Sequence, residues 1–175
     1  NTVSNLSSTR ALRDVTQNHG CEYFAAAVGE VNVVEKMKEV NAVIGGEGNG
    51  GVIYPELHYG RDALVGTALF LTQLAEKKVK CSELKQGYPQ YVMSKNKIQL
   101  TPTTDVDAIL AKFAEKFKNE KVTTIDGVKI DFEEGWVHLR KSNTEPIIRI
   151  YSEGKTEAEA ERFANMILEE AMKMV

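Results

Sequence analysis

The sequence predicts two consecutive domains of different class, an α/β domain over residues 1–90 and an α+β domain over residues 91–175. In the first part, helical and extended patterns alternate along the chain, and such alternation is typical of an α/β layer with parallel strand pairing. In the second part, most expected strands follow one another directly and two helices accompany them, which indicates an antiparallel sheet. Gly87-Tyr88-Pro89 interrupts regular structure between the two patterns, so we expect the domain boundary near Gln90.

N-cap residues and apolar spacing locate the elements of the first domain. Ser8 is expected to cap the first helix, and Asp62 is expected to cap the clearest helix of the chain. The apolar residues of that last helix form a stripe wide enough to face a core. The expected helices cover residues 8–19, 32–40, 62–77 and, as a single turn, 82–86, and the expected strands cover 22–26, 42–44 and 52–55.

In the second domain, turn and cap residues separate the expected elements. Asp126-Gly127 lies between two short apolar runs, and this dipeptide is typical of a tight hairpin turn. Thr156 and Glu159 have the spacing of a capping box at the start of the last helix. The expected strands cover residues 91–100, 122–125, 128–131, 136–139 and 147–151, and the expected helices cover 104–118 and 156–174.

The segment 140–146 between the last two expected strands is rich in hydrogen-bond donors. Arg140 offers a planar fork suited to two anionic oxygens, Ser142 and Thr144 offer hydroxyls, and Asn143 offers an amide. Pro146 restricts the backbone where the chain leaves the segment, which lowers the entropy of holding these donors together. A phosphate monoester is the ligand that this donor set predicts. The alternative is a polar connection between strands, because Ser, Asn and Thr are common in turns.

A second unusual segment, residues 45–51, contains five glycines among seven residues. It does not precede a helix as a dinucleotide-binding fingerprint must, and it lacks the Gly-Lys-Ser or Gly-Lys-Thr of a P-loop. It carries one carboxylate, Glu47, and one amide, Asn49, at the expected carboxyl end of a strand, where α/β sheets bind ligands. An acceptor beside a donor suits sugar hydroxyls. The alternative is a mobile hairpin tip in which glycine only permits positive φ.

Composition excludes several other classes. The chain has 175 residues, 42% of them hydrophobic, and a net charge of −3, which argues against general nucleic-acid binding. No apolar run approaches the ~20 residues that span a bilayer. Cys21 and Cys81 are far apart, and the three histidines are scattered, so we expect free thiols in a reducing cytoplasm and no metal ion held by this chain. The start of the chain lacks an initiator Met and a signal segment, which indicates a piece of something longer.

Together, residues 46–51 (Gly-Glu-Gly-Asn-Gly-Gly) and residues 140–146 (Arg-Lys-Ser-Asn-Thr-Glu-Pro) resemble two loops of the α-D-phosphohexomutases. This family includes phosphoglucomutase, phosphomannomutase and phosphoglucosamine mutase. The first segment is similar to the sugar-recognition loop of the third domain, and the second is similar to the phosphate-binding loop of the fourth. The resemblance covers essentially the whole chain, beginning at Asn5-Leu6-Ser7-Ser8-Thr9-Arg10.

The resemblance implies a three-layer α/β domain with a mixed sheet, followed by an α+β domain similar to the TATA-box-binding-protein fold. It also implies an enzyme that moves phosphate between C1 and C6 of a hexose through a phosphoserine and a hexose 1,6-bisphosphate intermediate, using Mg²⁺. The phosphoserine and magnesium loops belong to the family's first two domains, and neither motif occurs here. The chain would therefore be the recognition half, inactive alone, with the missing N-terminal domains and a hexose phosphate as its partners. A stand-alone phosphosugar-binding regulatory module is the alternative.

Residue by residue, the resemblance places Glu47 and Asn49 on sugar hydroxyls. It places Arg140, Ser142, Asn143 and Thr144 on the phosphate that is not reacting. Val28-Gly29-Glu30 stands where some members have Thr-Gly-His, and the carboxylate of Glu30 there would favour a cationic 2-amino group. The choice among glucose, mannose and glucosamine phosphates stays open, because Asn49 and Gly51 replace the Ser and His found in many bacterial members.

Overall fold

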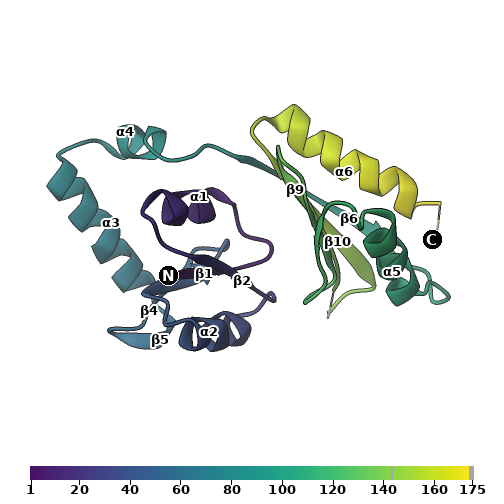
Figure 1. Ribbon diagram of the computed structural model, residues 1–175, viewed down its shortest axis with the longest axis horizontal. Coiled ribbons are helices and arrows are strands. Elements are labelled where there is room, and N and C mark those ends of the chain that lie inside the picture. The colour runs from purple at the N-terminus through teal and green to yellow at the C-terminus, as the bar shows by residue number, and fades with distance from the viewer. Residues whose placement is uncertain (143, 174–175) are drawn as a thin grey trace. The chain divides into compact units, whose positions relative to one another are not determined.

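The structure, a computed structural model that describes residues 1–142 and 144–173, divides into two compact units, Asn1–Gln90 and Tyr91–Val175 (Figure 1). The first unit contains a five-stranded mixed sheet and the second a five-stranded antiparallel sheet. Each sheet contributes to a hydrophobic core of its own. The predicted fold class, an α/β domain with a mixed sheet followed by an α+β domain, is confirmed.

The sheet of the first unit has the strand order β2-β1-β3-β4-β5. The interior strand β1 pairs in parallel with β2 and β3, whereas β4 and β5 are added antiparallel at one edge. The sequence did not predict β1 or β5. β1 lacks an apolar alternation because both of its faces are covered, and β5 is an exposed polar edge strand. The strands are β1 (Thr2–Asn5), β2 (Tyr23–Ala26), β3 (Ile44–Glu47), β4 (Gly51–Tyr54) and β5 (His58–Arg61).

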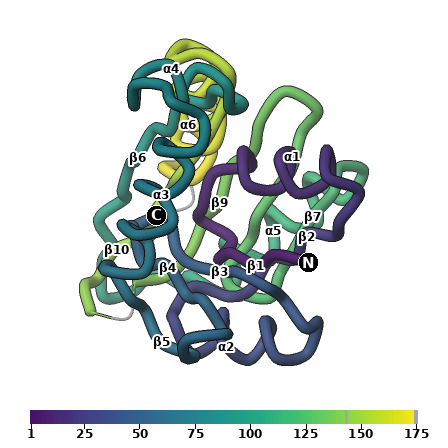
Figure 2. The backbone as a smooth tube through the Cα atoms, turned by 90° about the vertical axis from the view of Figure 1, so that its left-hand side faces the viewer, coloured from purple at the N-terminus to yellow at the C-terminus, as the bar shows by residue number. Residues whose placement is uncertain are grey.

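Helices cover both faces of this sheet, so the unit has three layers (Figure 2). On one face, Val3 and Ile53 pack against Val33 and Met37 of α2. On the other face, α1 joins the sheet through the hydroxyls of Thr2 and Thr16, which are 2.7 Å apart, and α3 approaches β4. The helices are α1 (Ala11–Asn18), α2 (Glu30–Glu39), α3 (Ala63–Lys77) and α4 (Cys81–Gln86).

Two expectations for these helices are wrong. Ser8 does not cap α1; its hydroxyl instead donates to Asn5 Oδ1 (2.9 Å), and the helix begins at Ala11. Asp62 does cap α3, but α3 buries no residue, and Leu64 is 82% exposed. Apolar residues surround α3 instead of forming one stripe. Two of them, Leu69 and Phe70, line an open pocket of about 700 Å³ together with residues of α1 and α4.

The sheet of the second unit has the order β6-β10-β9-β8-β7, and every neighbouring pair is antiparallel. Its strands are β6 (Val92–Gln99), β7 (Lys121–Thr123), β8 (Val128–Asp131), β9 (Trp136–Lys141) and β10 (Ile147–Gly154). The Asp126-Gly127 turn joins β7 to β8, as the dipeptide predicts, and Gly127 has a φ of +66°.

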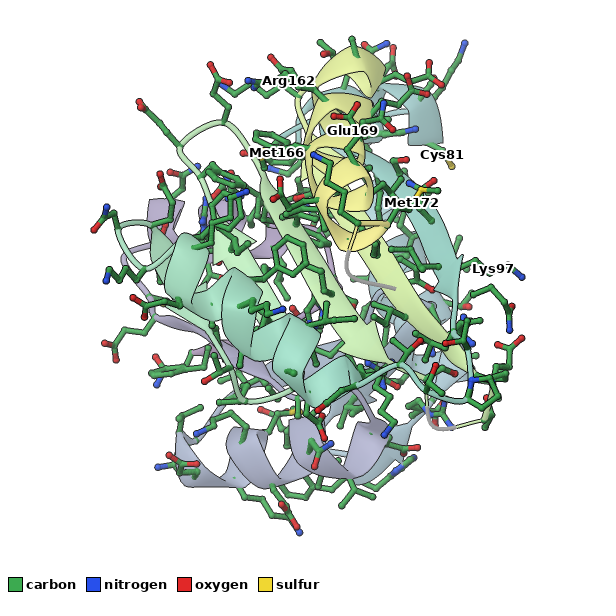
Figure 3. All side chains as sticks on the ribbon, turned by 90° about the vertical axis from the view of Figure 1, so that its right-hand side faces the viewer. Cys81, Lys97, Arg162, Met166, Glu169 and Met172 are labelled. Carbon is green, nitrogen blue, oxygen red and sulfur yellow. The ribbon has the colours of Figure 1, made fainter. Side chains whose placement is uncertain are left out.

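Helices α5 (Val106–Lys116) and α6 (Glu157–Ala171) cover one face of this sheet. Phe113 of α5 and Ile167 of α6 pack in one cluster with Leu139 and Ile150 of the sheet. Figure 3 shows the two helices on this side, with Arg162, Met166 and Glu169 along the outward side of α6. The predicted capping box is present, because Thr156 accepts from Glu159 N (3.2 Å) and Glu159 accepts from Thr156 N (3.1 Å).

Candidate functional site

Strand β3 brings Glu47 to the carboxyl end of the first sheet, beside the end of β1. Glu47 Oε1 accepts hydrogen bonds from Asn5 Nδ2 (2.8 Å) and from the backbone N–H of Gly29 (3.0 Å). Gly29, with a φ of +124°, is the N-cap residue of α2, so one of the bonds comes from the positive end of a helix. Among the described residues, Oε2 receives no hydrogen bond. The carboxylate is therefore held through one oxygen while the other is left to accept.

Asn5 is the residue that fixes this carboxylate, although no pattern in the sequence predicts a functional role for it. It is buried, and its Oδ1 accepts from Ser7 N (3.0 Å) and from the Ser8 hydroxyl (2.9 Å). Both ends of its amide are thus bonded, which orients Nδ2 toward Glu47. A polar residue at the end of an interior parallel strand indicates a functional site, but Asn5 can be recognised as such a residue only when β1 is known to lie between β2 and β3.

Asn49 lies in the turn between β3 and β4. Its Oδ1 accepts from Gly51 N (3.1 Å), so the side chain braces the turn, while Nδ2 donates to no other described residue. Asn49 lines a cavity of about 470 Å³ together with Glu30, Gly50, Gly51, Arg61 and Ala63. The cavity places the amide donor of Asn49 and the carboxylate of Glu30 around one opening.

Glu30 is already paired with a cation in this cavity. Its Oε1 accepts from Arg61 N (3.0 Å), and its Oε2 accepts from Arg61 Nε (2.7 Å). The backbone N–H of Arg61, followed by its guanidinium, lowers the pKa of Glu30 below its usual value. The sequence does not predict a role for Arg61, because the polar edge strand β5 that carries it has no strand-like pattern.

The predicted phosphate-binding segment is the connection of the β9–β10 hairpin. Ser142 is buried, its N–H donates to Ile147 O (3.0 Å), and its hydroxyl accepts from Thr144 N (3.4 Å). These bonds close the base of the connection and leave Thr144 exposed. Asn143, which was also predicted to bind phosphate, lies outside the described residues.

Arg140 lies near the end of β9, on the sheet face opposite α5 and α6. Its Nε is 3.4 Å from Asp126 Oδ2, and its side chain is 18% exposed. Across the sheet, Arg140 is paired in register with Arg149 of β10, which is paired in turn with Lys97 of β6. Like charges directly opposite each other destabilise a sheet. Two carboxylates offset part of this charge, because Arg149 donates to Glu145 and Arg140 lies beside Asp126. The three cations still exceed these two carboxylates by one charge, which an anion would stabilise. Arg149 and Lys97 could not be assigned from the sequence because their alignment depends on strand register.

The described residues around Glu47 and Arg140 form no metal site. Within residues 1–142 and 144–173, no group of three or more His, Cys, Asp and Glu side chains is placed to hold a metal ion. None of the described helices is long and apolar enough to cross a membrane. Cys21 and Cys81 are both free and exposed.

The first unit has three layers and a carboxylate fixed by hydrogen bonds, and the second unit has an antiparallel sheet with a cationic hairpin. Comparisons with known proteins identify the class of protein that combines these two units. The family model described as "Phosphoglucomutase/phosphomannomutase, alpha/beta/alpha domain III" matches residues 1–91. The model described as "Phosphoglucomutase/phosphomannomutase, C-terminal domain" matches residues 76–170. The chain belongs to the phosphoglucomutase/phosphomannomutase family, which confirms the resemblance.

Individual relatives agree with this membership. The phosphoglucomutase/phosphomannomutase of Thermococcus kodakarensis is 40% identical over 98% of this chain, and the phosphoglucosamine/phosphogalactosamine mutase of Sulfurisphaera tokodaii is 37% identical over 99%. The chain spans about 38% of the length of each of these two relatives. A solved phosphoglucomutase/phosphomannomutase family protein from Burkholderia thailandensis superimposes with a TM-score of 0.77 at 28% identity, over 98% of this chain and 37% of that one.

Proposed function

We propose that this chain is the substrate-recognition part of a phosphohexomutase, which interconverts hexose 1-phosphate and hexose 6-phosphate by phosphoryl transfer. The observation that carries the proposal is the row of cations across β9, β10 and β6, in a chain whose relatives are mutases of phosphorylated hexoses. In this proposal residues 1–90 form the sugar-recognition domain and residues 91–175 form the phosphate-binding domain.

Each predicted site residue has a role in the proposal. Glu47 accepts from sugar hydroxyls through its unbonded oxygen, and Asn49 donates its amide to a neighbouring hydroxyl. Arg140, Ser142, Asn143 and Thr144 bind the phosphate that is not being transferred. Binding energy from a non-reacting group orients the substrate for the transfer at its other end, which is how recognition residues contribute to rate.

We place magnesium and the phosphoryl carrier outside the described residues of this chain. The carboxylates here do not form a set of metal ligands, so we assign no residue to Mg²⁺ and derive no step through it. We place the magnesium ligands, the phosphoserine and the transfer that forms hexose 1,6-bisphosphate in the part of the relatives' length that this chain does not cover. The free, exposed cysteines support a reducing cytoplasm as the compartment.

The pairing of Glu30 with Arg61 bears on the choice of sugar. A lone carboxylate at position 30 would favour a cationic 2-amino group, but the guanidinium of Arg61 already compensates its charge. We therefore give Gly29 and Glu30 a supporting role: Gly29 bonds Glu47, and Glu30 holds Arg61 in the cavity. The proposed substrate class is a hexose phosphate, with no preference for an amino sugar derived from Glu30.

A nuclear magnetic resonance titration of the 175-residue chain tests the proposal. Glucose 6-phosphate is expected to shift signals near Glu47 and near Arg140, whereas inorganic phosphate is expected to shift only those near Arg140. Arg140→Lys should weaken binding by roughly tenfold, because Lys keeps the charge but not the planar fork, and Arg140→Ala should weaken it further. An unchanged dissociation constant in Arg140→Ala would contradict the proposal.

A further inference from the structure

We propose that the turn formed by Asp126 and Gly127 is the device that positions the Arg140 guanidinium for anion binding, with Asp126 as the positioning residue. This inference rests on the proposed function of Arg140. Three contacts carry it. The Asp126 carboxylate contacts Arg140, the Asp126 backbone carbonyl contacts His138, and the Gly127 backbone lies against Leu139 and Arg140. The contacted residues are thus three consecutive positions of β9, of which Arg140 is the last.

The carboxylate of Asp126 acts on the Nε side of the guanidinium. Asp126 Oδ2 lies 3.4 Å from Arg140 Nε, and the side chains are 21% and 18% exposed, so solvent screens the pair only in part. An arginine held at Nε keeps both terminal nitrogens available, and these two form the fork that binds two oxygens of a phosphate. Arg140 Nε has no hydrogen bond to any described residue. The contact is therefore an ion pair that orients the group and still allows it to adjust to a ligand.

The backbone of Asp126 is held to the same strand by His138. His138 Nε2 donates to Asp126 O (2.7 Å), and His138 is 1% exposed. His138 lies two positions before Arg140, so both side chains are on one face of β9. A carbonyl can only accept, so Nε2 carries the proton, and the imidazole ties the turn to the strand that presents Arg140.

Gly127 brings the turn into backbone contact with β9. A Cβ at this position would lie 2.1 Å from Leu139 O and 2.9 Å from Arg140 Cα, and the φ of +66° also disfavours a side chain. The strand register agrees, because Val128 is paired with Leu139 at the start of β8. The turn therefore packs on the peptide that leads into Arg140, and a displacement of the turn would displace the arginine.

The pair between Arg162 and Glu134 offers a matched control. It has a close contact of 2.6 Å, but both side chains are 60% exposed. Exposed pairs of this kind contribute little to stability or orientation. Glu134→Gln removes a carboxylate from the same unit as Asp126→Asn does, without touching the strand that carries Arg140.

The test follows the Arg140 Nε–H signal of the 175-residue chain by nuclear magnetic resonance, assigned by its loss in Arg140→Lys. Asp126→Asn keeps the size of the side chain. It is expected to shift this signal and to weaken the binding of inorganic phosphate and of glucose 6-phosphate by roughly fivefold or more. Glu134→Gln should change neither. In the Arg140→Ala background, Asp126→Asn should cause no further loss, because the carboxylate acts through the arginine.

The outcomes separate this inference from the proposed function. If Arg140→Ala weakens phosphate binding while Asp126→Asn leaves both the affinity and the Nε–H signal unchanged, the positioning role is wrong and the proposed function stands. If Arg140→Ala itself has no effect, both are wrong. Should Asp126→Asn fail to fold, Asp126→Glu, which keeps the charge but moves it by one methylene, is expected to shift the signal and give an intermediate affinity. An unchanged signal and affinity in that variant would also overturn the inference.

Discussion

His138 shows how one buried side chain links the stability of the second unit to pH. The pKa of His138 is lowered from 6.5 to about 4. Burial is the largest cause, the hydrogen bond to the Asp126 carbonyl and the Asp126 charge oppose it, and the positive charges of Lys129 and Arg140 add to it. The ring is therefore neutral at neutral pH in the folded protein. Protonating it would place a third positive charge beside two existing ones.

We predict that the free energy of unfolding falls as the pH decreases from about 6.5 to about 4. In this window the unfolded chain binds a proton at position 138 that the folded chain does not, so acid favours unfolding; above 6.5 the contribution of His138 is fully present. The full effect is about 3 kcal/mol. Urea denaturation at a series of pH values measures it, and His138→Gln, which keeps a donor, should flatten the dependence across that window. An equal slope in His138→Gln and in the unchanged chain would show that other groups are responsible.

Residue types alone could indicate part of the candidate site. Glu47, Asn49, Arg140 and Ser142 were found because polar side chains stand in segments whose glycine content or donor density is unusual. Asn5 and Arg61 could not be found in this way, because their importance comes from strands that the local pattern does not reveal. The same holds for Asp126. Its Asp-Gly dipeptide predicted a turn, but only the pairing of β8 with β9 places that turn beside Arg140.

At the scale of elements, local signals were sufficient where an element is specified by its own ends. The Asp-Gly hairpin and the capping box of α6 are present as predicted, because caps and turns act over three or four residues. Burial was harder to predict. The apolar residues of α3 were expected in a core, yet the helix buries none of them, since burial depends on what the remaining fold places opposite a helix face.

The cap of α6 provides a prediction at this scale. Thr156→Ala removes the side-chain acceptor for Glu159 N and should lower the free energy of unfolding by about 1 kcal/mol. Weakening the start of α6 should destabilise the core of the second unit as well, because α6 buries Phe163 and Ile167 against the sheet. Thr156→Ser keeps the hydroxyl and serves as the control. Urea denaturation of the three proteins measures the difference, and equal midpoints for Thr156→Ala and Thr156→Ser would mean that the cap does not limit stability.

At the scale of the whole molecule, the proposed function assigns recognition and chemistry to different parts of the family's length. Both family models that match this chain describe late domains, and the chain spans about 38% of the Thermococcus kodakarensis relative. The sequence contains neither the Ser-His-Asn-Pro string of a phosphoserine loop nor the Asp-x-Asp-x-Asp string of a magnesium loop. Electrostatic groups that hold a hexose phosphate are insufficient for transfer when no nucleophile or phosphoryl donor is positioned.

We therefore predict that the purified chain binds glucose 6-phosphate but shows no mutase turnover in a coupled assay with glucose 1-phosphate, mannose 1-phosphate or glucosamine 6-phosphate. Turnover above the blank would contradict this expectation. A chimera in which the chain replaces the matching part of the Thermococcus kodakarensis relative should regain turnover, because that relative would supply the absent loops to a similar recognition half. In the chimera, Glu47→Gln should lower kcat/KM by about one to two decades through loss of a charge-assisted hydrogen bond. A chimera that folds and binds glucose 6-phosphate without turnover would instead favour a binding module, since recognition would then exist without the alignment that transfer requires.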